Sequence, residues 1–402
     1  MIEEEKDRQA ENIELIASEN FVSDDILLAL GSCLTNKYSE GYPAVRHDSG
    51  KSGRYYGGCK FIDKIEEYCC DKWKEVFNTD YHVNVQPHSG SQANIAAYMS
   101  VLHPGDRILS MSLSNGGHLS HGSPVNASGK FYEVDFYSVD DSGRIDYGNV
   151  AQKIREFRPH LVVAGASAYS REIDFARIYD IIVEAAEEVN ILSPAPYSVW
   201  DIGRPFFMVD MAHIAGLVAA GLHQSPFGKA DIITTTTHKT LRGPRGGMIF
   251  CKQCLAKKVD GAVFPGSQGG ALQNVVAAKA IAAEEALTPE FKKYISDVVA
   301  NCKAMCDEFI SLGYDVVTGG TDNHLFLLDF SKTHPNLTGK AVQEELDKHG
   351  ITLNKNCVPN ETRSPVVASG VRIGTAAETT KGKTAEDFIQ IARRIDAVIS
   401  AM

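Results

Sequence analysis

The chain has 402 residues, of which 44% are hydrophobic and 23% charged, and its formal net charge is −11. This length can bury a large core, as one large domain with a smaller one beside it. The negative charge, without a cluster of basic residues, argues against a nucleic-acid partner, because phosphate-backbone binders concentrate lysine and arginine. The best candidate for a membrane span, Ala212 to Leu222, is too short and is interrupted by His213 and two glycines.

The first half of the chain alternates helical and strand-like stretches. Residues 1 to about 18 carry charged and apolar side chains at helical spacing, and the polar cluster Ser18-Glu19-Asn20 predicts a loop. Further helices are predicted at 61–77 and from 95 onward, and short strands at 83–85, 107–111, 160–164 and 206–210. This alternation predicts crossover units and a mainly parallel sheet.

The second half changes in character after a long helical region at 271–312, which is interrupted by Pro289 and ended by Gly313. A strand at 325–330, a helix at 339–348, another strand and a last helix from about Thr384 follow. This order is typical of a small α+β domain. We therefore predict an N-terminal arm at 1–30, a large domain at 31–272 and a small domain at 273–402.

The cysteines predict a reducing environment. There are nine of them, without framework spacing, and the acidic N-terminal segment is unlike a signal peptide, so we expect free thiols in the cytoplasm. Cys251 and Cys254 have C-x-x-C spacing, but a structural zinc site needs a second pair and a redox site needs a thioredoxin-like setting. Cys69 and Cys70 fall in a helical stretch and are predicted to pack as small hydrophobic residues.

The most informative segment is TTTTHKT at 234–240, which follows the apolar run Ala230 to Ile233. It predicts a strand that ends at an edge of the sheet, with His238 and Lys239 projecting from it before a loop at 241–247. A lysine aimed in this way can form a Schiff base with a carbonyl compound, above all pyridoxal phosphate. Because a lone His-Lys pair is commonly a solvated surface feature, the assignment depends on the cofactor's other requirements.

Two further segments supply those requirements. Ser89-Gly90-Ser91 directly precedes a helix and would bind an anion there, although an ordinary serine cap is the alternative. Asp210 ends an apolar strand, where it would face the ring nitrogen of the cofactor, although a helix-capping aspartate is the alternative. His213 follows closely enough to share the site. Asp210 precedes Lys239 by 29 residues, so that two strand ends one crossover unit apart converge on one crevice.

Two other site types are rejected. Asp48 to Ser52 imitates the end of a phosphate-binding P-loop, but Val45 stands where that motif needs glycine, and no strand leads into it. The thirteen histidines show no H-x-x-x-H spacing, so we expect no metal site.

Several stretches occur in the order found in serine hydroxymethyltransferases: IASEN at 16–20, NKY at 36–38, RYYGG at 54–58, PHSGSQAN at 87–94, GGHL at 116–119, DMAH at 210–213 and TTTTHKTLRGPRGG at 234–247. The chain resembles that family over nearly its whole length. The resemblance implies an α/β pyridoxal-phosphate enzyme of fold type I, with a large domain built on a mainly parallel sheet and a smaller C-terminal α+β domain. The implied reaction converts serine and tetrahydrofolate reversibly to glycine and 5,10-methylenetetrahydrofolate.

The resemblance also implies roles for individual residues. The positions that match cofactor-binding residues are Ser89, Gly90, Ser91 and His238 at the phosphate, His118, Ser167, Asp210 and His213 at the ring, and Lys239 as the covalent anchor. Arg372 matches the arginine that binds the substrate carboxylate, with Ser18 assisting it. The matching catalytic positions are Lys239, His213, the acid–base carboxylate Glu40, and Tyr55 and Tyr56 in the same pocket.

Tyr38 and Gly270 match residues that reach the cofactor of a neighbouring subunit, so a homo-oligomer, at least a dimer, is expected. The positions that match folate-binding residues are Leu113, Gly117, His118, Leu119, Asn356, Ser364, Pro365 and Val366. The expected partners are therefore serine, glycine and folate.

The chain departs from the family pattern at three places. An insertion within Ala44 to Gly53 lies between two expected pocket residues and would affect the access of folate. A second, at about Ile191 to Arg204, is expected to be a surface excursion. The chain also starts later than family members usually do, which puts the stability of the oligomer in question.

Alternative activities remain open at this point. A threonine aldolase or an alanine racemase would need the same lysine and the same ring-nitrogen partner, while the folate positions favour the transferase. A non-catalytic scaffold with this fold would be expected to lose site residues, and none is lost.

Overall fold

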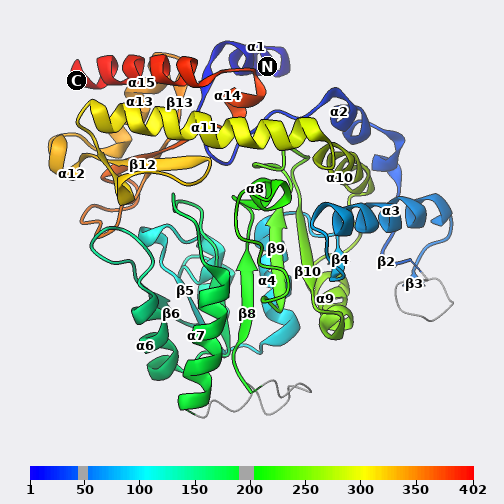
Figure 1. Ribbon diagram of the computed structural model, residues 1–402. Helices are drawn as coiled ribbons and strands as arrows, with labels where there is room; N and C mark the ends of the chain where they lie inside the picture. The colour runs from blue at the N-terminus through cyan, green and yellow to red at the C-terminus, as the bar shows by residue number, and fades with distance from the viewer. Residues whose placement is uncertain (44–52, 190–202) are drawn as a thin grey trace.

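The computed structural model describes residues 1–43, 53–189 and 203–402. Its central sheet has seven strands in the order β4-β10-β9-β8-β7-β5-β6, and Figure 1 shows it in the lower half of the molecule. The strands are β4 (His82–Asn84), β5 (Arg107–Met111), β6 (Glu133–Tyr137), β7 (Leu161–Ala164), β8 (Phe206–Asp210), β9 (Ile232–Thr236) and β10 (Gly247–Cys251). β10 runs antiparallel to both of its neighbours, β4 and β9, and the remaining strand pairs of this sheet are parallel. The predicted mainly parallel sheet is confirmed.

Apolar residues cover both faces of this sheet. Alternate residues of β7 and β8 enter two separate clusters: Val162 and Phe207 belong to one, Val163 and Met208 to the other. These strands read as continuous apolar runs because helices bury both of their faces. The first cluster includes residues of α3 (Lys60–Val76), α6 (Tyr147–Phe157), α7 (Phe175–Glu188), α8 (Ala215–Ala220) and α10 (Gln273–Ala286). The second includes residues of α4 (Gly90–Val101) and α9 (Ala256–Gly261).

The long helical region at 271–312 is two helices, as the proline predicted. Helix α11 (Pro289–Ser311) has Pro289 in its first turn and Thr288 as its N-cap. Its first half packs in the core of the large domain, whereas Cys302 to Phe309 belong to the core of the small domain. The helix therefore runs across both domains, as the yellow ribbon in Figure 1 shows.

The small domain is built on a four-stranded antiparallel sheet in the order β11-β12-β15-β14. Its elements are β11 (Asp315–Val316), β12 (Leu325–Asp329), α13 (Gly339–Lys348), β14 (Asn354–Asn356), β15 (Gly370–Gly374), α14 (Ala376–Thr380) and α15 (Ala385–Ser400). The predicted strand, helix and last helix are confirmed. The domain limits themselves stay a prediction.

The N-terminal segment differs from the prediction. Helix α1 (Ile2–Glu11) ends well before residue 18, and β1 (Ile13–Glu14) pairs in parallel with β13 (Ile351–Thr352). Ile13 and Leu15 donate backbone hydrogen bonds to Gly350 and Thr352. Leu15 is fully buried in the small-domain core. Partners far away in the sequence thus extend this segment, overriding its local helical spacing.

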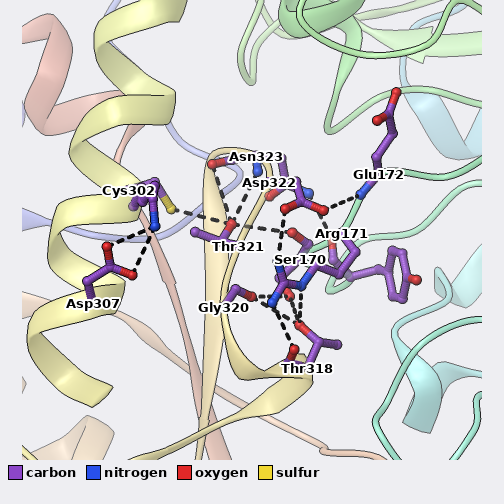
Figure 2. A network of polar contacts seen from close by, with 12 residues as sticks. Ser170, Arg171, Glu172, Cys302, Asp307, Thr318, Gly320, Thr321, Asp322 and Asn323 are labelled. Atoms are coloured by element: carbon purple, nitrogen blue, oxygen red, sulfur yellow. Dashed lines mark hydrogen bonds and ion pairs between the residues drawn. The ribbon is translucent and has the colours of Figure 1, made fainter. Parts of the chain in front are cut away.

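A polar network joins the loop after β7 to the small domain (Figure 2). The guanidinium of Arg171 donates to Asp322 Oδ1 at 2.8 Å, to Thr318 Oγ1 at 2.9 Å and to the Thr318 carbonyl at 2.8 Å. Ser170 Oγ donates to the Gly320 carbonyl at 3.0 Å. Gly320 has φ +149°, which residues with a side chain rarely adopt, and a Cβ there would lie 2.7 Å from the Arg171 guanidinium, so glycine suits this position. These contacts fix the small domain against one end of the large sheet.

All nine cysteines lie in the described ranges and are free thiols, with Cys69 and Cys70 buried in α3 as predicted. No helix in these ranges has both the length and the apolar content needed to span a membrane. Residues 44–52 of the first insertion and 191–202 of the second lie outside the described residues, as does the P-loop-like stretch.

Replacing Arg171 by alanine should loosen the contact between the domains. The variant loses its hydrogen bonds to Thr318 and Asp322, so we expect the free energy of unfolding to fall by about 1–3 kcal/mol in urea denaturation. Arg393, whose exposed side chain pairs with Glu308, is the control. Arg393→Ala should leave the free energy of unfolding nearly unchanged, because exposed ion pairs contribute little to stability. Similar losses in both variants would contradict the role given to Arg171.

Candidate active site

A cavity of about 320 Å³ opens where the parallel strands end and the small domain begins. Asp210 is the last residue of β8, and Lys239 follows the end of the neighbouring strand β9. Crevices at the carboxyl ends of such strands are the usual binding sites of open α/β sheets. The lining residues are Ser18, Ser89, Gly90, Ser91, His118, His121, Ala166, Ser167, Asp210, Ala212, His213, Thr236, His238, Lys239, Arg245 and Arg372.

Asp210 is held as a carboxylate whose side chain is 11% exposed. Its Oδ2 accepts hydrogen bonds from His121 Nε2 at 3.0 Å and from Asn94 Nδ2 at 2.9 Å, and its Oδ1 accepts from the backbone of Ala212 at 3.0 Å. Burial alone would raise the pKa of Asp210, but the hydrogen bond and charge of His121, with Lys239 nearby, hold that pKa well below its usual range. The group is therefore suited to face a protonated ring nitrogen.

Lys239 is a buried amine. Burial lowers the pKa of Lys239 to about 8; Asp210 opposes this shift, and Arg372 and Arg245 add to it. The neutral, nucleophilic form is thus accessible near neutral pH, as covalent attachment to an aldehyde requires. Its backbone is fixed too, because Asn20 Nδ2 donates to the Lys239 carbonyl at 2.9 Å.

Three neutral imidazoles surround these charges. Burial is the main cause that lowers the pKa of His118 to about 4 and that of His238 to about 3, and it holds the pKa of His213 well below its usual range. His118 Nδ1 lies 2.6 Å from Ser120 Oγ, which fixes the orientation of its ring. Neutral rings can pack against a flat aromatic ligand without adding charge beside it.

Residues 89–91 place a helix N-terminus at the wall of the cavity, which makes them the candidate anion site. Ser89 is the N-cap of α4, where its Oγ accepts from the Gln92 backbone, and Gly90 and Ser91 begin the helix. Ser89 is therefore both the helix cap that the sequence offered as an alternative and a residue that lines the cavity. A Cβ on Gly90 would lie 2.6 Å from Thr236 Cγ2, so the helix start approaches β9 closely. Backbone N–H groups at a helix N-terminus favour a phosphate, and a phosphate-bearing aldehyde fits this donor set together with Lys239 and Asp210.

Arg372 brings the small domain into the site. It lies in β15, is buried, and donates through one terminal nitrogen to the Ser167 carbonyl at 2.6 Å and through Nε to Asn354 at 3.2 Å. Burial lowers the pKa of Arg372 to about 10, so the group stays charged at neutral pH. Ser18, from the N-terminal segment, lines the same cavity. A small carboxylate beside Lys239 would meet both side chains.

A second cavity of about 360 Å³ shares His118 with the first. It is lined by three of the positions predicted for folate, Leu113, His118 and Pro365, together with Ser112, Ser114, Ser123, Pro124, Phe136, Cys357, Glu361 and Arg363. The other five predicted positions, Gly117, Leu119, Asn356, Ser364 and Val366, do not line it. At Gly117 a Cβ would lie 2.1 Å from the Met111 carbonyl, so the chain has no room for a side chain there.

Five predicted residues lie together outside both cavities. Tyr38 and Tyr56 make an edge contact at 5.3 Å between ring centroids, and the Tyr55 backbone donates to the Glu40 carbonyl at 3.1 Å. A Cβ on Gly270 would lie 3.7 Å from the Tyr38 ring and 3.8 Å from Glu40 Cγ. The three tyrosines are 47–79% exposed in the single chain. In one chain these groups therefore do not reach Lys239.

Some site residues were not predicted. His121 and Asn94 support Asp210, and both lie in or beside quoted motifs, since His121 follows His118 by three positions. His324, at the start of β12, places Nε2 3.1 Å from His213 Nδ1 and is fully buried. No local pattern indicates His324, because this contact joins the two domains.

One further grouping bears on the expected lack of a metal. Ligand atoms of His118, His121 and Asp210 lie within 4.8 Å of one another, close enough to hold an ion. The Asp210 carboxylate already accepts hydrogen bonds from His121 and Asn94. The absence of a metal stays a prediction.

The lowered pKa of Lys239 predicts a pH dependence of stability. In the unfolded chain this lysine binds a proton up to about pH 10.5, but in the folded chain only up to about pH 8. Between these values the unfolded state binds more protons, so stability rises with pH, by about 3 kcal/mol at most. The free energy of unfolding in urea is measured for the cofactor-free protein at pH 7.5 and pH 10. It should rise more between these pH values in the wild-type chain than in Lys239→Met. An equal rise in both proteins would contradict the shift.

The comparison with known protein families agrees with this site. A family model described as serine hydroxymethyltransferase matches residues 1–395. Enzymes of this family use pyridoxal phosphate, with tetrahydrofolate as co-substrate. The match covers all but the last seven residues and includes every candidate residue named above. The chain belongs to the serine hydroxymethyltransferase family.

Proposed function

We propose that this chain converts serine and tetrahydrofolate to glycine and 5,10-methylenetetrahydrofolate, reversibly, at the cavity around Lys239. The observation that carries the proposal is the convergence of Lys239 and Asp210 on one buried cavity that also holds an anion site and Arg372. When bound, pyridoxal phosphate supplies an electron sink for the bonds at the amino acid's Cα. The remaining work falls to the chain's own side chains.

Asp210 and the imidazoles orient the cofactor in this proposal. The Asp210 carboxylate, kept ionised by His121 and Asn94, would hold a proton on the ring nitrogen. His118 would pack on the ring, and Ser167 and His213 would contact its phenolic oxygen. Ser89 to Ser91 and His238 would bind the phosphate. Each of these residues lines the same cavity.

Arg372 fixes the substrate. Its guanidinium is buried, charged and oriented by the Ser167 carbonyl and Asn354, so a bidentate contact with the amino-acid carboxylate needs little further ordering. Ser18 would add a donor. This contact would hold the amino acid in one orientation at the cofactor, and the Lys239 amine would hold the cofactor itself covalently.

We propose that a second copy of the chain completes the site. Glu40, Tyr38, Tyr55, Tyr56 and Gly270 cluster on one surface, yet they line neither cavity of their own chain. The exposed tyrosines give this surface an apolar area suited to an interface. In a dimer, Glu40 would accept or donate the proton of the hydroxymethyl group in its partner's cavity.

We further propose a cytoplasmic location, because all nine cysteines are free thiols.

The second cavity supports folate binding. It adjoins the first through His118, so that a ligand bound there could present a nitrogen to the carbon leaving serine. A threonine aldolase or alanine racemase activity at Lys239 would not use this cavity, and no observation favours either as the main reaction.

Replacing Lys239 by alanine should lower kcat for serine cleavage by on the order of 10³ or more, because the amine that binds the cofactor covalently is lost. Borohydride, which fixes the cofactor to the wild-type chain, should leave it dialysable in the variant. The assay is run with and without tetrahydrofolate, and omission should slow wild-type turnover. Turnover and trapping that persist in the variant would remove Lys239 from the mechanism, and folate-independent cleavage would rule out the transferase reaction.

Mixing two inactive variants tests the shared site. Glu40→Gln and Lys239→Ala each inactivate both cavities of a homodimer, but a mixed dimer has one cavity with an intact Lys239 and an intact partner Glu40. Co-expression should therefore restore about a quarter of wild-type activity if the chains assemble at random. Lys239→Ala paired with Asp210→Ala is the control and should restore less, since these residues lie in one cavity. Equal activity from the two pairings would contradict sharing.

A further inference from the structure

Lys279, in α10, is a buried lysine that the proposed mechanism does not use. Its side chain is 1% exposed. The ammonium donates to three backbone carbonyls, those of Val85 at 2.7 Å, Gly247 at 2.8 Å and Pro87 at 3.2 Å. Among the described residues it forms no ion pair with a carboxylate. It is thus a buried positive charge whose three hydrogen bonds all go to backbone carbonyls.

Such a charge is costly to bury. An ammonium loses its hydration in the interior, and carbonyl dipoles replace only part of it. Accordingly, burial lowers the pKa of Lys279 to about 8. A lysine is therefore expected here only if it has a role, in binding a ligand or in fixing the backbone, that an apolar side chain could not fill.

The three carbonyls belong to the two segments that build the anion site. Val85 and Pro87 lead directly into Ser89, and Gly247 follows the loop that carries Arg245. These segments are in close contact: the Gly247 backbone donates to the Pro87 carbonyl at 3.0 Å. A Cβ on Gly247 would lie 2.4 Å from the Ser89 carbonyl, and one on Gly246 would lie 2.5 Å from Lys279 Cε. The ammonium ties both segments together behind the site.

The charge of Lys279 also reaches the cavity. Burial, and then the charges of Lys239, Arg245 and Lys279, lower the pKa of His238 to about 3. His238 lines the cavity beside Ser89 to Ser91. A phosphate bound there would therefore meet the field of Lys279 through a layer of backbone, without touching it.

We propose that Lys279 is a positioning residue for the cofactor phosphate. It holds the segments before Ser89 and after Arg245 in register, so that their donors converge on the anion, and the bound phosphate balances its buried charge. This inference rests on the proposed placement of the phosphate at Ser89 to Ser91.

The test compares two ligands that differ only in the phosphate. Dissociation constants of pyridoxal phosphate and of pyridoxal are measured by absorbance titration of the cofactor-free protein and of Lys279→Met. We expect the affinity for pyridoxal phosphate to fall by about tenfold or more, and that for pyridoxal to stay unchanged. Lys292→Met, on the exposed face of α11, is the control and should change neither. Lys279→Gln keeps a hydrogen-bond donor without the charge, and it replaces Lys279→Met in the titrations if the methionine variant does not fold.

Three outcomes decide between the possibilities. If Lys279→Met weakens both ligands equally, or weakens neither, the positioning role is wrong. Ser91→Ala separates this failure from a failure of the proposed phosphate site, because it removes a hydroxyl that lines the cavity directly. If Ser91→Ala also leaves the preference for pyridoxal phosphate over pyridoxal unchanged, the phosphate binds elsewhere. If only Ser91→Ala reduces that preference, the site stands and Lys279 has no part in it.

Discussion

The convergence of Asp210 and Lys239 on one cavity is the constraint on which the rest of the site depends. Asp210 ends β8 and Lys239 follows the neighbouring parallel strand β9, so the fold brings them to the same edge of the sheet. Burial disfavours the charged form of both groups, yet only Lys239 shifts toward its neutral form. Hydrogen bonds from His121 and Asn94 keep Asp210 ionised, whereas burial and the charges of Arg372 and Arg245 shift Lys239 toward its neutral form, against the charge of Asp210. A fixed anion and a labile amine are the two groups that an aldehyde cofactor with a basic ring nitrogen requires.

The small domain turns this crevice into a substrate site. Arg372 enters from β15 and Ser18 from the N-terminal segment, which β1 ties to the small domain. Their position relative to Lys239 depends on how the two domains are held, and the Arg171 network (Figure 2) together with the shared helix α11 holds them. His324 makes the same connection inside the site, through its contact with His213. The proposed substrate contacts therefore depend on the interface between the domains.

The charge of the cavity is opposite to that of the molecule. The chain as a whole carries a net charge of −11. Among the charged lining residues, however, Lys239, Arg245 and Arg372 face the single carboxylate Asp210, with Lys279 behind the wall. The site is therefore short of negative charge, and a phosphate and an amino-acid carboxylate both supply it. The neutral histidines allow this excess without further repulsion.

Local patterns in the sequence predicted most of the elements and the two central residues. Apolar runs ending in a polar residue marked β8 and β9, and so placed Asp210 and Lys239 at strand ends. Family motifs predicted the roles of Arg372 and Ser18. Tertiary structure decided what depends on distant partners. Pairing with β13 made β1 extended where spacing had predicted helix. Only folding brought Asn94 and His121 to Asp210, His324 to His213, and Lys279 to the segment before Ser89. It also separated Glu40 and its tyrosines from the cavity of their own chain. Periodicity reports which face of a segment is buried, whereas the identity of the atoms across that face is set by chain topology.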